Sequence, residues 1–307
     1  MFSPCSFALL FALVFVALLP LGIGVIVSSS KVVQYSKSYA DCKASECFVT
    51  FEVTEDMEEP VFLYYELTEM YRNHRLYVKS RSNEQLAGED LSKSEISETC
   101  ENIQEVKDLW AYSGSSVAAS LAPEAVANPC GLIANSFFND SFSFVQPAIE
   151  MRRHGISWYE DDSRYEKLEN WRSKQWTNVE AEDFSVWMRA SATTTSKRLY
   201  GVVEQTLKPG NYTVKAINRY ADVTKWGGDK RLVLSTSSAF GGTNYLLGSL
   251  LVAISCIAFL ELLLILLCFR QPSRSPYFAD LDCSAHPILN TKPEDGSPGE
   301  RRVLDPS

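Results

Sequence analysis

Histidine is scarce in this chain, and the motifs of common catalytic and nucleotide-binding sites are missing. Only His74, His154 and His286 occur, and there is no C-x-x-C pair, so a zinc site lacks its usual ligands. No G-x-S-x-G elbow, G-x-x-x-x-G-K-[ST] loop or H-E-x-x-H helix is present. We therefore predict a protein that is not an enzyme and has no catalytic residues, no cofactor, no metal and no small-molecule substrate of its own.

Basic residues are also fewer than acidic residues. The formal net charge is −9, and no basic patch with interleaved aromatic residues occurs, which argues against a nucleic-acid partner. The run Glu160-Asp161-Asp162 could form an acid pair or a calcium site, but such a run is more typical of an exposed acidic turn.

Two long apolar runs lie at opposite ends of the chain. The first covers residues 6–27 without a charge, and the second covers residues 245–269 with only Glu261 interrupting it. Each is long enough to cross about 30 Å of hydrocarbon as a helix. A carboxylate inside a span costs about 2.5 kcal/mol or more, so we expect Glu261 to be protonated, paired or turned toward a protein partner.

The flanks of the two runs predict the topology. Arg270 and Arg274 follow the second run, which places the tail, residues 270–307, in the cytosol and predicts that it is disordered. With two spans, residues 1–5 are cytosolic too. No basic residue precedes the long first run, so it does not resemble a signal peptide, although cleavage near residues 28–30 is an alternative. The missing basic residues also suggest that the natural chain begins further upstream.

The segment between the spans, residues 28–244, has the features of a lumenal or extracellular domain. It contains the sequons Asn139-Asp140-Ser141 and Asn211-Tyr212-Thr213, which are glycosylated only in the secretory lumen. It also contains an even number of cysteines, which is typical of disulfides in an oxidising compartment. Three pairings are open, and proximity favours the nearest neighbours; the four are Cys42, Cys47, Cys100 and Cys130.

Short runs of β-branched and aromatic residues between turn signals predict a fold that is mainly β with some α. The expected strands cover residues 48–53, 61–67, 184–190, 212–217 and 231–236. In the first, alternation places Val49, Phe51 and Val53 on one face of a half-buried sheet. Residues 227–229, Gly-Gly-Asp, predict a hairpin loop between the last two strands. Residues 71–81 look helical or irregular, 92–109 helix or loop, and 113–129 a loop of small residues.

Four stretches are long and specific motifs: VFLYYELT at 61–68, YRNHRLYVKSR at 71–81, PCGLIANS at 129–136 and EDFSVWMR at 182–189. They resemble the signature of the cell division control / ligand-effect modulator family, the accessory (β) subunits of type IV P-type ATPases, which are phospholipid flippases. LST at 234–236 and Gly241-Gly242 follow in the family's order. The resemblance extends over residues 19–269.

The resemblance implies an antiparallel β-sandwich ectodomain, jelly-roll-like, between two transmembrane helices. It implies a non-catalytic subunit that forms a heterodimer with the ATPase catalytic subunit. Such a subunit helps the ATPase to fold, to leave the endoplasmic reticulum and to move phospholipids, and thus maintains membrane lipid asymmetry. The expected location is integral to the endoplasmic reticulum, the Golgi/endosomal system or the plasma membrane, in contact with membrane lipids.

Some family residues carry over to single positions. Cys130 matches a family disulfide cysteine, and Cys100 stands where its partner belongs. Only Cys42 and Cys47 remain of a first cluster that often has four members, which implies one bridge there. Asn139 matches a glycosylated position, whereas Asn211 rests on its sequon alone. Our candidates for contact with the partner are Gly22, Gly24, Tyr64, Tyr65, Asn73, His74, Arg75 and Glu261.

Other protein classes share the two-span layout. ATP-gated and acid-sensing channel subunits have this topology, and Gly248-Ser249 in the second span is similar to a narrow filter motif. Those channels carry far more ectodomain cysteines, and Gly-Ser in a span more often serves helix packing. An adhesion or sugar-binding domain would leave the second span unexplained.

Overall fold

The computed structural model describes residues 4–42, 45–110, 120–220 and 223–270. The chain divides into two compact units, one formed by Met1–Val27 with Asn244–Ser307 and the other by Ser28–Thr243. Residues 1–3 of the expected cytosolic N-terminus and residues 271–307 of the expected tail lie outside the described residues, as do residues 111–119, which overlap the expected small-residue loop.

The first unit contains two long apolar helices, α1 (Pro4–Ser30) and α9 (Tyr245–Arg270). Both are long and apolar enough to cross a membrane, over Ser6–Ser30 and Tyr245–Cys268. Many of their large apolar side chains are exposed, for instance Leu13 and Leu246. Helices of this kind are stable in lipid because their backbone hydrogen bonds are made internally.

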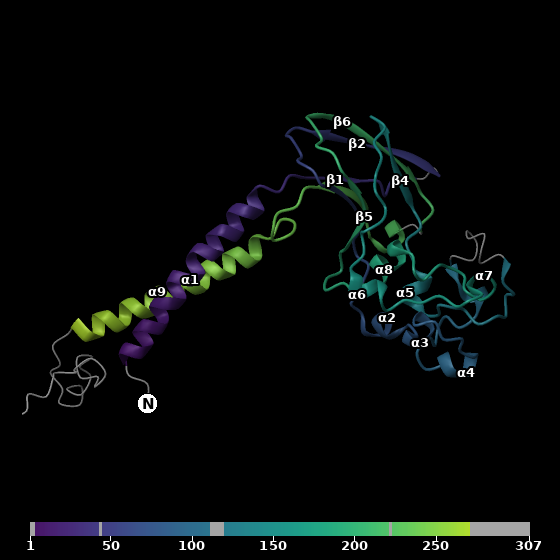
Figure 1. Cartoon of the computed structure of the whole chain (residues 1–307), viewed down its shortest axis with the longest axis horizontal. Coiled ribbons are helices and arrows are strands. Elements are labelled where there is room, and N and C mark those ends of the chain that lie inside the picture. The colour runs from purple at the N-terminus through teal and green to yellow at the C-terminus, as the bar shows by residue number, and fades with distance from the viewer. Residues whose placement is uncertain (1–3, 43–44, 111–119, 221–222, 271–307) are drawn as a thin grey trace, which may run out of the picture. The chain divides into compact units, whose positions relative to one another are not determined.

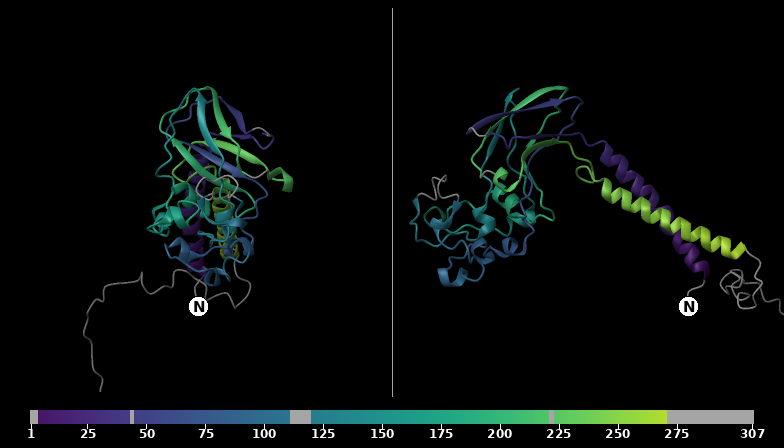
Figure 2. Two further views of the ribbon diagram at one scale, coloured as in Figure 1. Left: turned by 90° about the vertical axis from the view of Figure 1, so that its right-hand side faces the viewer. Right: turned by 180° about the vertical axis from the view of Figure 1, so that it is seen from behind.

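The two helices lie side by side (Figures 1 and 2), and small residues lie at their contact. A Cβ atom on Gly22 would lie 2.9 Å from Cγ2 of Val252 and 3.1 Å from the carbonyl oxygen of Gly248. Further along, the rings of Phe15 and Phe259 have centroids 4.9 Å apart. Glycines on facing helices let the backbones approach closely, which is how helices associate in lipid.

The second unit is built on two antiparallel sheets (Figure 1). The four-stranded sheet has the order β1-β7-β3-β5, with β1 (Gln34–Ser38), β7 (Lys230–Ser235), β3 (Val61–Leu67) and β5 (Ser196–Val203). The three-stranded sheet has the order β2-β6-β4, with β2 (Glu46–Val53), β6 (Gly210–Ile217) and β4 (Ser141–Gln146). The predicted antiparallel sandwich between two apolar helices is thus confirmed.

The core lies between the sheets and follows the alternation of the strands. In β2, Val49, Phe51 and Val53 are buried and their neighbours are exposed, as predicted. In β3, Val61 and Leu63 are fully buried. Side chains that alternate in this way fill the space between two packed sheets, and their burial is the main driving force for folding.

Short helices occupy the long connections between the strands, and Figures 1 and 2 show most of them gathered at one end of the sandwich. They are α2 (Arg75–Lys79), α3 (Asn83–Leu86), α4 (Lys93–Ile96), η1 (Val106–Asp108), α5 (Leu132–Asn135), α6 (Tyr159–Asp162), α7 (Trp171–Lys174), α8 (Glu182–Met188) and η4 (Val223–Trp226).

Two local predictions are wrong. Residues 184–190 do not form a strand, because Glu182–Met188 is helix α8. Phe184 to Met188 are all buried, so their burial follows neither a helical nor a strand period. A run of this length is also typical of a buried strand, which explains the wrong prediction. The expected hairpin at residues 227–229 is absent, since β6 pairs with β2 and β4 while β7 pairs with β1 and β3. The connection therefore crosses from one sheet to the other.

Glu182 fixes the segment before α6 to the start of α8. Its carboxylate accepts hydrogen bonds from the backbone N–H groups of Gly155 at 2.9 Å, Ile156 at 2.6 Å and Ser157 at 3.1 Å. Partial burial raises the pKa of Glu182, but the three N–H donors lower it by more, so that the net shift is downward. The ionised form therefore stabilises the fold.

We expect Glu182→Gln to lower the free energy of unfolding at neutral pH by about 1 to 2 kcal/mol, because charge-assisted hydrogen bonds are lost. A lowered pKa in the folded state gives stability that is present above the unfolded value of 4.5 and lost as the pH falls through the folded pKa. Urea unfolding of the full chain at several pH values measures this. The variant and the wild type should converge at acid pH, whereas Glu150→Gln, at an exposed position, should have little effect at any pH.

Candidate partner-binding site

The candidate residues in the two helices have different surroundings. Gly22 faces α9, so packing within the chain accounts for it. Gly24 has no atom within 4 Å of the position where a Cβ would stand and is open to a neighbour. Glu261 is exposed on α9, and no described residue forms an ion pair with it. Gly24 and Glu261 thus remain available for contact with another molecule.

Tyr64 and Tyr65 point to opposite faces of β3. Tyr65 is buried, and its ring stacks on Phe138 with centroids 3.9 Å apart. Burial raises the pKa of the Tyr65 hydroxyl. Tyr64 is half-buried, and Nζ of Lys197 lies 4.6 Å from the centroid of its ring. Tyr65 is therefore a core residue, and only Tyr64 reaches the surface.

The loop after β3, residues 71–76, presents most of the other candidates. Asn73, His74 and Arg75 are all exposed, and so are the large side chains of Tyr71 and Leu76, which are 58% and 66% exposed. Exposed aromatic and aliphatic side chains among polar ones are typical of a protein-binding surface. We call residues 71–76, of which Arg75 and Leu76 begin α2, the 71–76 loop.

Arg72 holds this loop from beneath. It is 1% exposed, and its guanidinium lies 3.9 Å from the ring centroid of Trp187 in α8. It donates to Oγ of Ser196 at 3.2 Å and to the carbonyl oxygen of Trp187. A buried guanidinium with these contacts fixes the backbone of its neighbours, so the exposed side chains of the 71–76 loop stand on a rigid base.

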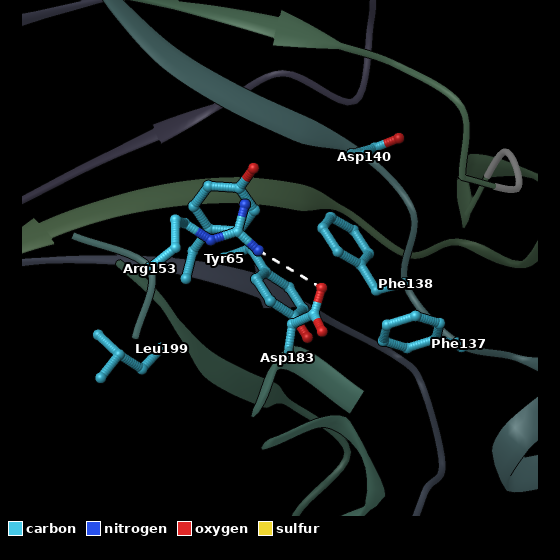
Figure 3. Close-up of a pocket in the computed structure, with 8 residues that line it drawn as sticks. Tyr65, Phe137, Phe138, Asp140, Arg153, Asp183 and Leu199 are labelled. Carbon is cyan, nitrogen blue, oxygen red and sulfur yellow. Dashed lines mark ion pairs between the residues drawn. The ribbon is translucent and has the colours of Figure 1, made fainter. Parts of the chain in front are cut away.

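A small pocket lies beside this base (Figure 3). Its volume of about 20 Å³ holds roughly one water molecule, so it does not fit a lipid or a substrate. Arg153 reaches over it, with its guanidinium 3.7 Å from the ring centroid of Tyr200 and 3.5 Å from a carboxylate oxygen of Asp183. The aromatic lining includes Tyr65, Phe137 and Phe138. The pocket lies at the edge of the core, where Arg153 and Asp183 are partly exposed, and it is too small for a substrate site.

The cysteines of the second unit are paired, and the asparagines of its two sequons lie at the surface. Cys42 is bonded to Cys47, and Cys100 to Cys130. The second bond is buried, with both cysteines at most 1% exposed. Asn139 and Asn211 are exposed at the surface, where a glycan can attach.

Sequence reasoning missed a buried ion pair next to one sequon. Asp140, the middle residue of the sequon at Asn139, is buried, and its Oδ2 lies 3.0 Å from Nζ of Lys230. Little in the sequence signals this pair, because Lys230 stands between two other charged residues, Asp229 and Arg231. It also missed the burial of Arg72, and it described Asp161 as exposed, whereas this carboxylate is paired with Arg189 at 2.5 Å.

These features define a class: a two-span integral membrane protein whose disulfide-bonded β-sandwich exposes large apolar side chains next to β3. The sequence matches the model of the LEM3 (ligand-effect modulator 3) family / CDC50 family over residues 25–274. The chain belongs to this family. It is accordingly a non-catalytic accessory subunit of type IV P-type ATPase flippases, as the resemblance implied. Family membership sets aside the channel alternative.

Individual relatives agree with the family match. Cell cycle control protein 50A of Mus musculus is 29% identical over 86% of this chain and 83% of the relative. Putative ALA-interacting subunit 2 of Arabidopsis thaliana is 33% identical over 74% of this chain and 66% of the relative. Cell cycle control protein 50C of Mus musculus is 30% identical over 74% of this chain and 77% of the relative.

Proposed function

We propose that this chain forms a heterodimer with the catalytic subunit of a type IV P-type ATPase. In this role it supports the folding of the ATPase, its exit from the endoplasmic reticulum and its transport of phospholipids, and hence membrane lipid asymmetry. The observation that carries the proposal is the family match, which extends from the end of α1 through the ectodomain and α9. The names of the ALA-interacting relatives support a partner of this kind.

The proposed topology places the ectodomain, residues 28–244, in the lumen or outside the cell, and residues 1–5 and 270–307 in the cytosol. Two disulfides support it, because such bonds persist in oxidising compartments. The exposure of Asn139 and Asn211 supports it as well. The chain then resides in the endoplasmic reticulum, the Golgi/endosomal system or the plasma membrane.

Two surfaces are suited to the partner. Outside the membrane, the 71–76 loop offers exposed apolar and polar side chains on the base fixed by Arg72. Inside it, Glu261 stands exposed on an apolar helix, where a charged carboxylate costs about 2.5 kcal/mol or more unless it meets a polar group. A transmembrane helix of the ATPase that supplies such a group would make Glu261 a contact residue.

The test is to express the ATPase with and without this chain in cells that lack every paralogue. We expect the tagged chain to co-purify with the ATPase. We also expect the ATPase to remain in the endoplasmic reticulum when the chain is absent, and cellular uptake of a labelled phospholipid to fall to background. Microscopy and the uptake assay measure these effects. Normal exit and uptake without the chain would refute the proposal.

Variants of the same chain locate the contact in the membrane. Glu261→Leu should reduce the ATPase recovered with the chain several-fold, while Cys256→Leu, another exposed position on α9, should leave recovery unchanged. Equal recovery with both variants would show that Glu261 is not a contact, although the heterodimer itself would stand.

Enzymatic removal of N-glycans should lower the apparent mass of the chain, and the shift should be smaller in Asn139→Gln.

A further inference from the structure

Arg72 carries a buried positive charge without a described carboxylate beside it. Its guanidinium is held by Ser196, by the carbonyl oxygen of Trp187 and, at 3.3 Å, by the carbonyl oxygen of Arg189. No described Asp or Glu lies within 4.0 Å of it. A buried charge is costly unless an opposite charge compensates it, and carbonyl dipoles do so only in part.

A second guanidinium shares one of these acceptors. Nη2 of Arg198, a half-buried residue of β5, donates to the carbonyl oxygen of Arg189 at 2.5 Å and to that of Ala190 at 3.1 Å. Arg72 and Arg198 therefore meet at a single carbonyl oxygen. Among the described side chains, no carboxylate forms an ion pair with Arg198 either.

The side chain of Arg189 adds a third guanidinium to those of Arg72 and Arg198. Its Nε pairs with Asp161 at 2.5 Å, and its guanidinium lies 4.1 Å from the ring centroid of Trp158. Its side chain is 18% exposed, so this member reaches solvent. We call Arg72, Arg189 and Arg198 the arginine cluster.

The charges and hydrogen bonds of the arginine cluster do not balance among the described residues. Among the described residues, the three guanidinium groups form a single ion pair, that of Arg189 with Asp161. Each also has a buried nitrogen without a hydrogen-bond partner: Nε of Arg72, Nη2 of Arg189 and Nε of Arg198. Burial, followed by the charge of Arg72, lowers the pKa of Arg198 to about 10. Ordered water could satisfy the N–H groups, but it could not offset the charge.

We propose that the arginine cluster binds an oxyanion, either a phosphate or a carboxylate. Guanidinium groups present their N–H donors in a planar fork that matches two oxygens of such an anion. The anion would enter beside Arg189, where Ala190 and Ala192 are exposed and Nδ2 of Asn73 bonds the carbonyl oxygen of Ala192 at 3.4 Å. The inference rests on these contacts and not on the proposed function.

The first experiment uses inorganic phosphate with the full chain purified in detergent. Phosphate should raise the melting temperature along a saturating curve at constant ionic strength, because a ligand that binds only the folded state stabilises it. In Arg198→Gln the apparent dissociation constant should rise at least tenfold. Arg198→Lys keeps the charge but loses the fork and should bind with intermediate strength. Arg231→Gln, which removes an arginine paired with Asp229 at the surface, should behave like the wild type.

Broadening of the phosphorus resonance of phosphate, measured with the chain alone and with its complex, distinguishes the sources of the anion. Binding to both supports a free anion as the natural ligand. Binding to the chain alone supports a carboxylate of the partner that occupies the cluster in the complex. Binding to neither overturns the proposal, as does a melting curve that does not saturate or one that is the same in wild type and Arg198→Gln. Absence of the heterodimer would leave the result with the chain alone intact.

Discussion

Lys230→Met is expected to destabilise the ectodomain by about 3 to 5 kcal/mol, because it leaves a buried carboxylate without its charge partner. The side chains of Lys230 and Asp140 are 2% and 0% exposed, and Nζ lies 3.0 Å from Oδ2. The hydroxyl of Tyr39 donates to the same oxygen at 3.0 Å. The backbone N–H groups of Arg219 and Tyr220 donate to Oδ1 at 2.5 and 2.6 Å. Asp140 thus joins three separate parts of the sandwich.

The size of this effect is a large share of the total stability of a domain, which is about 5 to 15 kcal/mol. We therefore expect the variant to accumulate poorly and to unfold at much lower urea concentration, as followed by tryptophan fluorescence of the full chain. Lys215→Met is the matched control, because Lys215 pairs with Glu46 at the surface, at 2.8 Å. Such pairs contribute about 0 to 1 kcal/mol.

A double-mutant cycle isolates the pair itself. Asp140→Asn removes the charge but keeps an oxygen that can accept from the backbone, and it preserves the sequon at Asn139. Lys230→Met should therefore cost less in the Asp140→Asn background than in the wild type, with a coupling energy of about 1 to 3 kcal/mol. If Lys230→Met is no more harmful than Lys215→Met, the buried pair is not essential.

The sequence predicted the parts of this fold that repeat a local pattern. β2 was found because its buried side chains alternate, and β3 because it is rich in β-branched and aromatic residues. Both membrane helices were found because apolar runs of that length have few other roles. β4 was missed although Phe142 and Phe144 alternate with polar residues, so the signal was present. β1 had no such signal, because Gln34–Ser38 is polar, mostly exposed and paired through its backbone with β7.

The candidate site was predictable only in outline. The 71–76 loop was selected because it matched a family motif, but its exposure depends on Arg72 being buried under Trp187, which lies far along the chain. The positive charge of Arg72 predicts an exposed side chain. Only the tertiary structure shows that a ring, a hydroxyl group and two carbonyl groups surround its guanidinium. The same reason explains why Asp140 and Lys230 were not paired in advance.

Removal of the bond between Cys100 and Cys130 is expected to cost about 3 to 4 kcal/mol, the second large effect. The bond closes a loop with a sequence separation of 30. On the chain-entropy model, its loss raises the conformational entropy of the unfolded chain and lowers the free energy of unfolding by this amount. Both sulfur atoms are buried against the core, and the backbone N–H of Cys130 donates to Oε1 of Gln85 at 2.9 Å. The bond therefore also fixes the connection that leads into α5.

The test replaces both cysteines of each bond with alanine, which avoids leaving a free thiol. Cys100→Ala with Cys130→Ala should give a chain that folds poorly, is retained in the endoplasmic reticulum and melts well below the wild type. The matched control is Cys42→Ala with Cys47→Ala, where a sequence separation of 5 gives a smaller entropic contribution of about 2 kcal/mol. Equal loss of stability in the two double variants would contradict the loop argument, because local packing rather than loop length would then set the effect.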